Sequence, residues 1–315
     1  MAPTPTIIVA DLTRHFGPLT VVDRLTFDMQ PGEIFGLVGP DGAGKTTTLR
    51  MLAGVLGADG GSAMIAGHDV IHDPESAKPD LSYMSQRFGL YEDLTVDENI
   101  RFYADVFGVV RAERTQRSAK LLAAAGLSDV GNRLAGNLSG GMKQKLGLVC
   151  AFMHTPRALL LDEPTNGVDP VSRRDFWRLL YSLAGEGVAI LVSTSYLDEA
   201  ERCHRVGLLH RGRLLFCDRP DELKKQFPGG VLAVRAPDPT RVRQALMGSP
   251  AVRGTLLVGD RVDVLVDDAA RGLPEVRRTL DEQHVPYVTV SPVSPSIEDL
   301  FVSAVETLPR GAPAP

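Results

Sequence analysis

The chain contains little of what marks a secreted or membrane-spanning protein. It has only three cysteines, Cys150, Cys203 and Cys217, and they form no C-x-x-C pair, which argues against a disulfide framework and against structural zinc. No stretch approaches the ~20 consecutive apolar residues that a membrane span requires. Residues 1–6 show neither the basic start nor the apolar core of a secretory signal, so we expect a cytosolic chain that does not cross a bilayer by itself.

Positive charge is also in short supply. Acidic residues outnumber basic ones by 39 to 34, and the formal net charge is -5 at pH 7. Nucleic-acid-binding proteins usually carry a basic surface, so no nucleic-acid partner is expected. With 315 residues and 43% hydrophobic content, the chain is able to bury a full core, and we expect more than one domain.

Short apolar runs alternate with helical patterns over the first 220 residues. This alternation is typical of an α/β fold, in which helices cover a mostly parallel sheet. The predicted strands are 7–10, 25–29, 34–38, 61–66, 81–85, 158–161, 189–193, 206–210 and 213–217, of which the first two are expected to form an antiparallel edge. The predicted helices 98–107, 111–125 and 140–153 follow one another between two strands. We therefore expect a mixed sheet core with a helical subdomain at about residues 87–150.

The pattern changes at residues 227–230 (Phe-Pro-Gly-Gly), where we place a domain boundary. The segments beyond it are predicted as strand 231–235, helix 240–247, strands 254–258 and 262–266, helix 273–283 and strand 287–291. This βαββαβ order predicts a small α+β domain of the ferredoxin-like kind, followed by a last helix at 296–305. The predicted domains are residues 1–227 and 228–306, and the tail 307–315 is expected to be disordered.

A glycine-rich turn directly follows the apolar strand 34–38. Residues 39–46 (Gly-Pro-Asp-Gly-Ala-Gly-Lys-Thr) fit the pattern G-x-x-x-x-G-K-[ST], and the residues that carry it are Gly39, Gly42, Gly44, Lys45, Thr46 and Thr47. Glycines let the backbone aim its N–H groups inward, and Lys45 adds a mobile positive charge at a helix start. The pattern predicts a nucleoside triphosphate ligand, with Thr46 on Mg²⁺ and Thr47 on the inner phosphates. The alternative is a turn that only joins a strand to a helix.

A second apolar strand, residues 158–161, ends in the carboxylates Asp162 and Glu163. The carboxyl ends of strands are where open α/β sheets hold their ligands, so both acids are expected to reach the phosphate site. Asp162 is suited to organise Mg²⁺, and Glu163 to polarise an attacking water. Two acids after an apolar run also occur by chance, and the glycine-rich turn upstream makes the functional interpretation specific.

The motifs together resemble those of the ATP-binding subunit of an ABC transporter. The matching segments, in order, are the loop 39–46, Gln86 after a strand, residues 138–144 (Leu-Ser-Gly-Gly-Met-Lys-Gln), the acidic pair, and residues 166–170 (Asn-Gly-Val-Asp-Pro). The resemblance covers most of the first 220 residues and implies a P-loop NTPase cassette that binds ATP and Mg²⁺. Residues 295–301 and 141–145 are similar to cassettes of drug-efflux and related export systems.

The resemblance implies roles for two residues outside the loop. Phe16 matches an aromatic that stacks on adenine, although an ordinary apolar strand residue is the alternative. Gln86 matches a residue that senses Mg²⁺ and the attacking water, and the segment 87–100 is then expected to face a membrane subunit. A surface-loop glutamine is the alternative there.

The resemblance also implies a dimer. Ser139, Gly140 and Gly141 match the signature that contacts ATP held by an opposite subunit, so two cassettes meet head to tail. Asp169 matches a loop that communicates between the two sites. No internal repeat is evident, so the second cassette is expected from another chain.

Two residues depart from the family pattern. Ser195 stands where the family has a histidine, and a serine hydroxyl does not span the same gap as an imidazole. Asp41 stands where asparagine is usual, and its carboxylate is unwelcome beside phosphates unless it faces away or bonds a backbone group. His204, nine residues after Ser195, is expected to be structural.

We therefore expect the ATP-hydrolysing subunit of an ABC exporter, in a homodimer or heterodimer of cassettes, bound to integral membrane subunits on the inner face of the cell membrane. Ser195 predicts slow hydrolysis at the chain's own site and a signature lent to a partner with an intact histidine. One alternative is a hydrolysis-impaired regulatory ATPase whose βαββαβ domain binds an effector. Another is an ABC ATPase acting on the ribosome or DNA, although the usual twin cassettes or coiled-coil insertion are not seen.

Overall fold

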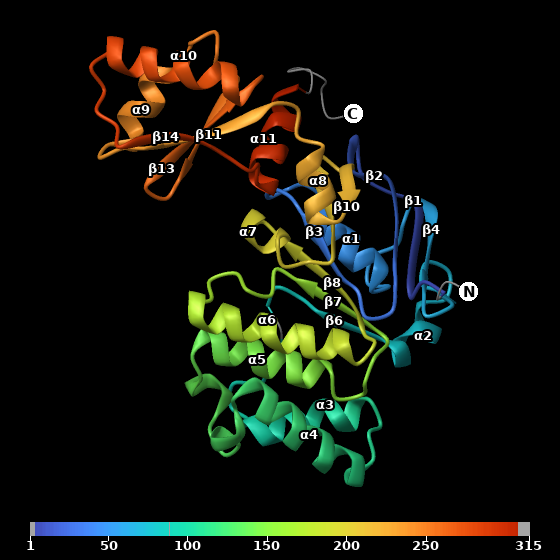
Figure 1. Cartoon of the computed structure of the whole chain (residues 1–315). Coiled ribbons are helices and arrows are strands. Elements are labelled where there is room, and N and C mark those ends of the chain that lie inside the picture. The colour runs from blue at the N-terminus through green and yellow to red at the C-terminus, as the bar shows by residue number, and fades with distance from the viewer. Residues whose placement is uncertain (1–3, 88, 308–315) are drawn as a thin grey trace. The chain divides into compact units, whose positions relative to one another are not determined.

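The computed structural model describes residues 4–87 and 89–307, which form two compact units that divide between Cys217 and Asp218 (Figure 1). Each unit is described by itself below. The second unit therefore includes residues 218–227, which were predicted to belong to the first domain. The domain limits 1–227 and 228–306 stay a prediction. Except for Thr307, the tail for which disorder is expected lies outside the described residues.

The first unit opens with an antiparallel sheet in the order β2-β1-β4-β5. Its strands are β1 (Ile7–Phe16), β2 (Leu19–Met29), β4 (Gly60–Ile65) and β5 (His68–Asp69). Side chains along β1 alternate between buried and exposed, since Ile7 and Val9 are buried and Ile8 is exposed. The predicted antiparallel pairing of the first two strands is confirmed, and both strands extend further toward their turn than predicted.

A second, six-stranded sheet has the order β10-β9-β3-β8-β7-β6. Its strands are β3 (Ile34–Val38), β6 (Leu81–Met84), β7 (Ala158–Asp162), β8 (Ala189–Thr194), β9 (Arg205–His210) and β10 (Arg213–Asp218). The five strands from β9 to β6 pair in parallel. Every residue of β3, β7 and β8 is buried, which explains why these strands are apolar up to the polar residues that end β7 and β8.

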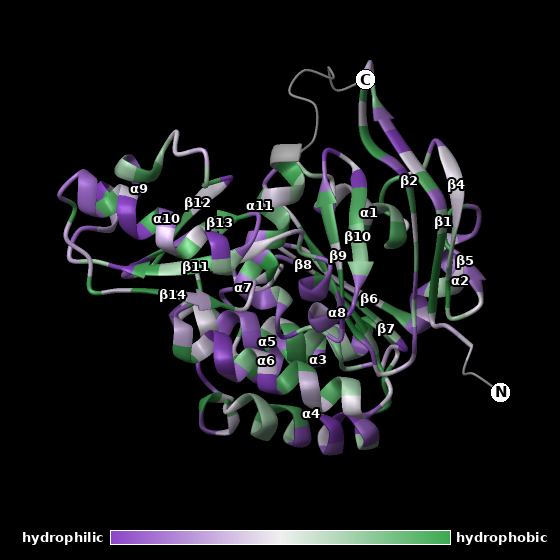
Figure 2. Ribbon diagram, turned by 45° about the horizontal axis from the view of Figure 1, so that its top comes forward, coloured by the Kyte–Doolittle hydropathy of each residue, from purple (hydrophilic) through white to green (hydrophobic). Residues whose placement is uncertain are grey.

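Helices fill the connections of this sheet. They are α1 (Lys45–Leu52), α2 (Pro74–Ala77), α3 (Val96–Val106), α4 (Arg111–Ala125), α5 (Gly140–Ala151), α6 (Pro170–Gly185) and α7 (Leu197–Ala200). Helices α3 to α6 pack on one another, and Figure 2 shows alternating hydrophilic and hydrophobic residues along α4. The predicted helical insertion is confirmed. Helix α6 was not predicted, although Asp169 caps it and Pro170 opens it, both of which are start signals.

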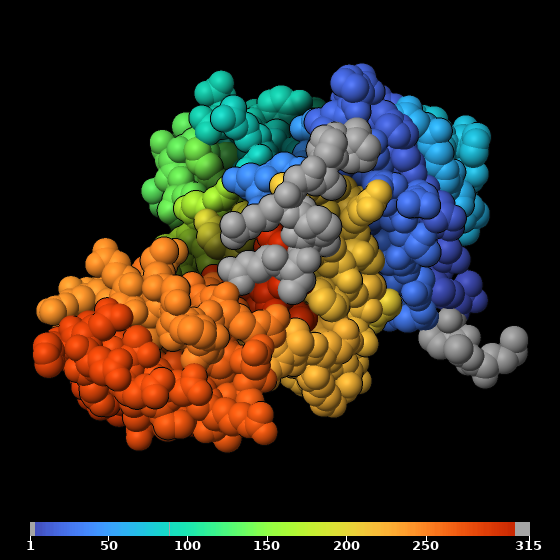
Figure 3. Space-filling view, turned by 90° about the horizontal axis from the view of Figure 1, so that it is seen from above, coloured from blue at the N-terminus to red at the C-terminus, as the bar shows by residue number. Residues whose placement is uncertain are grey.

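Segments from the two ends of the first unit meet beside the glycine-rich turn. The backbone N–H of Asp23 in β2 donates to the carbonyl of Gly212, in the turn between β9 and β10, and the N–H of Gly212 donates to the carbonyl of Ala43. Figure 3 shows blue, N-terminal parts of the first unit beside yellow parts from its other end. The turn is thereby enclosed by chain that is distant in sequence.

The second unit contains a four-stranded sheet in the order β12-β13-β11-β14, with every pair antiparallel. Its elements are α8 (Pro220–Lys225), β11 (Gly230–Arg235), α9 (Pro239–Leu246), β12 (Gly254–Val258), β13 (Arg261–Val266), α10 (Ala269–Glu282), β14 (Thr289–Val293) and α11 (Ile297–Thr307). This strand order is that of the ferredoxin-like fold, as predicted. Helices α9 and α10 share one apolar core with the sheet, and α10 begins at Ala269, earlier than predicted, because Asp268 caps it.

Candidate active site

Three parallel strands end together in the centre of the six-stranded sheet. Strand β3 pairs with β8, and β8 pairs with β7, so their carboxyl ends lie side by side. The backbone N–H of Gly39, after β3, donates to the carbonyl of Thr194 at 3.3 Å, and the N–H of Glu163, after β7, donates to the carbonyl of Ser193 at 3.1 Å. The edge therefore brings the loop after β3 to two loops that follow it by more than a hundred residues of chain.

The glycine-rich turn depends on the small size of its glycines. A Cβ at Gly39 would lie 2.1 Å from the carbonyl oxygen of Leu209, and a Cβ at Gly44 would lie 2.5 Å from that of Val21. Gly44 also has a φ of +107°, and Gly42 has a φ of +77°, which L side chains rarely adopt. The sequence folds locally into a tight cradle because a side chain at position 39 or 44 would clash, and because positions 42 and 44 take a backbone conformation that favours glycine.

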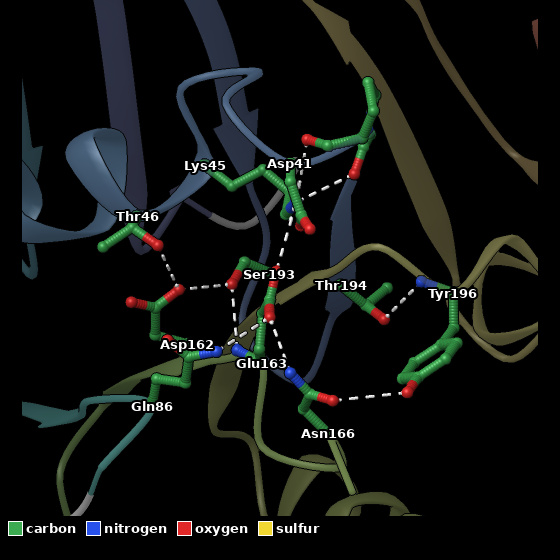
Figure 4. Close-up of polar contacts among 12 residues, drawn as sticks. Asp41, Lys45, Thr46, Gln86, Asp162, Glu163, Asn166, Ser193, Thr194 and Tyr196 are labelled. Atoms are coloured by element: carbon green, nitrogen blue, oxygen red, sulfur yellow. Dashed lines mark hydrogen bonds and ion pairs between the residues drawn. The ribbon is translucent and has the colours of Figure 1, made fainter.

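Lys45 opens helix α1 and is nearly enclosed, with 4% of its side chain exposed. Its ammonium donates to the carbonyls of Gly39 at 2.8 Å and Pro40 at 3.1 Å. It also lies 3.2 Å from Oε1 of Glu163. Two of the three ammonium hydrogens are therefore donated to carbonyls, and the contact with Glu163 is an ion pair (Figure 4).

Asp162 is buried at the end of β7 and gathers hydroxyl groups. Its Oδ1 accepts from Thr46 Oγ1 at 2.9 Å and from Ser193 Oγ at 2.7 Å, while its Oδ2 accepts from the Tyr83 hydroxyl at 3.3 Å. Burial, and then the charge of Asp162, raise the pKa of Tyr83. Oxygen donors of this kind are the ligands that Mg²⁺ prefers. Sequence analysis did not find Ser193 or Tyr83, although a polar residue at the end of a buried strand was a usable signal.

Both the backbone and the carboxylate of Glu163 are fixed by neighbouring residues. Its φ is +48°, a left-handed conformation that costs about 1–3 kcal/mol in a residue other than glycine. The backbone N–H compensates by donating to both the carbonyl and the Oγ of Ser193, the latter at 3.0 Å. The carboxylate is 11% exposed, and its Oε2 accepts from Gln86 Nε2 at 3.2 Å and from Asn166 Nδ2 at 3.3 Å. Lys45 and Gln86 therefore meet at one carboxylate, as Figure 4 shows.

Comparisons with known proteins show which family the chain belongs to. A family model described as ABC transporter matches residues 22–166. The chain is 32% identical over 306 residues to the daunorubicin/doxorubicin resistance ATP-binding protein DrrA of Streptomyces peucetius, covering 96% of this chain and 92% of that protein. It belongs to the ABC transporter family of ATP-binding proteins.

Other relatives place the cassette in the same group. It is 45% identical over 283 residues, 89% of its length, to a probable multidrug ABC transporter ATP-binding protein, YbhF, of Escherichia coli (strain K12), and it spans about half (48%) of that relative. A solved ATP-binding subunit of an ABC transporter matches 71% of the cassette chain and 93% of its own length, with 32% identity and a TM-score of 0.65. The ADP conformation of the cassette MJ1267, at 22% identity and a TM-score of 0.64, shows the same fold.

The residues predicted as the signature lie apart from the Lys45 cluster. Ser139 caps helix α5 and accepts from the N–H of Met142 at 3.3 Å. A Cβ on Gly141 would lie 2.4 Å from the Cβ of Ser172, so this glycine lets α5 approach α6 closely. Within residues 4–87 and 89–307, no hydrogen bond or ion pair joins Ser139, Gly140 or Gly141 to the cluster.

Three further residues predicted from the sequence lie outside the cluster around Lys45. Asp169 caps α6, and the hydrogen bonds from Ser172 and Val171 lower the pKa of its carboxyl. Phe16, at the end of β1, is 46% exposed, and the Arg14 guanidinium lies 5.0 Å from its ring centroid. Asp41 has 93% of its side chain in solvent and lies 4.0 Å from the Lys45 ammonium, so its carboxylate is well hydrated.

Ser195 follows β8 and is half-buried. In the described part of the chain, its hydroxyl makes no hydrogen bond. His204 accepts from the backbone N–H of Ile34 at 2.9 Å, as expected of a structural histidine. Across the described residues, no helix has both the length and the apolar character that a membrane span requires.

Proposed function

We propose that the chain binds Mg²⁺-ATP at the carboxyl ends of β3, β7 and β8 and hydrolyses it. One observation carries this proposal, namely that Lys45, Thr46, Asp162 and Glu163 gather over a cradle that only glycines can build. Backbone N–H groups at a helix start favour phosphates, and Lys45 adds the charge that a triphosphate requires. The phosphates are expected in the cradle of Gly39, Gly42 and Gly44, with Thr47 beside them.

Two oxygen donors fit a magnesium ion. The hydroxyl of Thr46 and the carboxylate of Asp162 are 2.9 Å apart, close enough to serve one cation. Magnesium, when bound, neutralises phosphate charge, and it usually takes its remaining ligands from phosphate and water. Gln86 adds an amide next to Glu163, from where it is placed to sense the ion and the water.

Glu163 is proposed as the residue that accepts a proton from the attacking water. It is the carboxylate that faces the cradle, and the chain holds it there at the cost of backbone strain. In the geometry described, Oε1 of Glu163 forms an ion pair with the Lys45 ammonium. Phosphate and Glu163 therefore compete for Lys45, and this contact has to be exchanged when nucleotide enters.

The signature residues fit a role in a second copy's site. Ser139, Gly140 and Gly141 present a capped helix start away from the Lys45 cluster, so we propose that a head-to-tail dimer of cassettes brings them onto the partner's ATP. Asp169 lies beside them at the start of α6, which suits communication across that interface. Phe16, exposed and aromatic, is proposed to stack on adenine.

We propose that the dimer energises export through integral membrane subunits, on the inner face of the cell membrane. The segment after Gln86 carries exposed apolar side chains, including Tyr91, Phe102 and Val106, and the rings of Tyr91 and Phe102 meet edge to face at 4.7 Å. Such a surface is typical of a protein interface. A cargo of the drug class is proposed because relatives are named for multidrug transport and daunorubicin resistance. Residues 228–306 are proposed as an accessory domain.

Nucleotide titration of a Lys45→Ala variant tests this function. Removing the ammonium is expected to weaken ATP binding by at least about 100-fold, since it removes a charge-assisted contact to phosphate. Lys120→Ala, which removes a lysine paired with Glu186 on the surface, is the matched control and is expected to bind normally. Unchanged ATP affinity in Lys45→Ala would overturn the proposal.

The residue at position 195 favours a second candidate, a cassette with impaired turnover. Among the described residues, Ser195 makes no hydrogen bond, and it stands where the family pattern has a preorganised donor. Loss of such a donor typically lowers turnover about 100-fold or more. Ser195→His is then expected to raise turnover, whereas Ser195→Ala is expected to leave it unchanged. A brisk wild-type turnover that falls in Ser195→Ala would contradict this candidate.

A further inference from the structure

Tyr196 follows the position where the chain lacks the family's histidine, and its side chain is held at both ends. The guanidinium carbon of Arg173 lies 4.4 Å from the ring centroid, and the hydroxyl lies 3.3 Å from Asn166 Oδ1. The backbone N–H of Tyr196 donates to Thr194 Oγ1 at 3.0 Å. The phenol therefore has a defined orientation in which its hydroxyl is aimed at Asn166 (Figure 4).

Asn166 connects this hydroxyl to the carboxylate of the proposed reaction. Its Nδ2 lies 3.3 Å from Oε2 of Glu163. An ionised carboxylate only accepts hydrogen bonds, so the amide must turn its NH₂ to Glu163 and its carbonyl to Tyr196. The Tyr196 hydroxyl then donates to an amide that donates to Glu163, and hydrogen bonds that run in one direction polarise and strengthen one another.

A fully buried carboxylate fixes the two loops that carry this chain of hydrogen bonds. Oε1 of Glu199 accepts from Thr165 Oγ1 at 2.6 Å, and its Oε2 accepts from Thr194 Oγ1 at 2.7 Å. Thr165 directly precedes Asn166, and Thr194 lies two residues before Tyr196. Because Glu199 joins both loops, the separation of Asn166 and Tyr196 is set by a buried anchor and not by surface loops alone.

We propose that Tyr196 is a positioning residue that orients the Glu163 carboxylate through Asn166, in a site without the family's histidine. The proposal rests on the proposed ATPase function and extends it. Holding Oε2 with Asn166 and Gln86 leaves Oε1 directed toward Lys45 and the glycine cradle, the side on which the phosphates are proposed to bind. Neither Tyr196 nor Asn166 needs to touch the nucleotide.

The test measures turnover together with affinity for a non-hydrolysable ATP analogue in the full chain. Tyr196→Phe keeps the ring against Arg173 and removes only the hydroxyl, and we expect kcat to fall about 5-fold, the effect of one neutral hydrogen bond. Asn166→Ala removes a hydrogen bond to a charged group, and we expect a fall of about 20-fold. The Kd of the analogue is expected to stay within about twofold of wild type in both, since the nucleotide contacts remain.

The double variant separates a relay from two unrelated effects. If Tyr196 acts only through Asn166, the Tyr196→Phe/Asn166→Ala variant has the turnover of Asn166→Ala alone, because the coupling is complete. Tyr181→Phe is the matched control, since it removes a tyrosine hydroxyl that donates to the carbonyl of Arg202 at 2.8 Å, outside the site. Its turnover is expected to equal that of wild type.

Three results would overturn the relay. These are a Tyr196→Phe variant as active as Tyr181→Phe, a double variant whose losses multiply, and a Kd that rises by the same factor by which kcat falls. Glu163→Gln distinguishes this failure from a wider one. If Glu163→Gln abolishes turnover and Tyr196→Phe leaves it unchanged, only the relay is overturned. If the wild type has no turnover, or if its turnover does not depend on Glu163, the proposed function is overturned as well.

Discussion

The ion pair between Lys45 and Glu163 predicts that loss of an active-site charge strengthens nucleotide binding, which is unusual for an active-site variant. Glu163→Gln keeps the size of the side chain but removes its charge, and we expect it to bind an ATP analogue more tightly while turnover is lost. The reason is competition, because the Lys45 ammonium already donates to two carbonyls and is attracted by the charge of Glu163, from which phosphate has to draw it.

The structure gives the size of this effect. Two unit charges 3.2 Å apart attract by about 5 kcal/mol at an effective dielectric constant of 20. A glutamine oxygen at this position is able to accept a hydrogen bond from Lys45 worth about 1 kcal/mol, and rehydration of the released carboxylate offsets much of the rest in the wild type. A net gain of about 1.4 kcal/mol, or a tenfold lower Kd, is the expected outcome.

Isothermal titration with a non-hydrolysable ATP analogue measures this change directly. Glu186→Gln is the matched control, because it makes the same change in net charge at a surface pair, where Glu186 lies 2.8 Å from Lys120. Its Kd is expected to equal that of wild type. The competition argument is refuted if Glu163→Gln binds no more tightly than wild type, or if Glu186→Gln gains as much. Turnover of Glu163→Gln is expected to fall at least about 100-fold, since a general base is lost.

Two further predictions concern stability, and urea denaturation checks both. Gly141→Ala is expected to cost about 1–3 kcal/mol, because its Cβ overlaps Ser172, and Ser172→Gly in the same chain should restore most of this loss; no rescue would exclude that clash as the cause. Burial lowers the pKa of His154 from its ordinary 6.5, so the unfolded chain binds a proton that the folded chain refuses, and stability falls as the pH drops below about 6.5. His154→Gln should reduce this loss of stability between pH 7 and pH 5. It should not abolish the loss, since burial also lowers the pKa of His210. An unchanged dependence of stability on pH would contradict the assignment to His154.

Much of the fold could be predicted because its signals are local. Helix α4 spans the predicted residues 111–125, and the buried strands β3, β7 and β8 are apolar runs in the sequence. The βαββαβ order of the second unit was also readable from its succession of segments. Helix α6 was missed because its start lies within the Asn166 to Pro170 motif, which was interpreted for function and not for its capping signals.

The candidate site was predictable only in part. Lys45, Thr46, Asp162 and Glu163 stand in motifs with fixed spacing, and a strand end followed by a charged residue is a local pattern. The hydroxyl of Ser193, the phenol of Tyr83 and the link from Tyr196 to Asn166 have no such spacing. Each of them depends on a contact across at least 30 residues of chain.

The sequence by itself determined where the chain turns tightly, where strands run buried, and which residue types stand at their ends, because glycine backbone freedom, apolar periodicity and motif spacing act over a few residues. Only the tertiary structure decided that β8 lies between β3 and β7. That strand order brings Lys45 within 3.2 Å of Glu163 and places Tyr196 beside Asn166. Strand order is set by the packing of the whole sheet and its helices, to which every segment contributes.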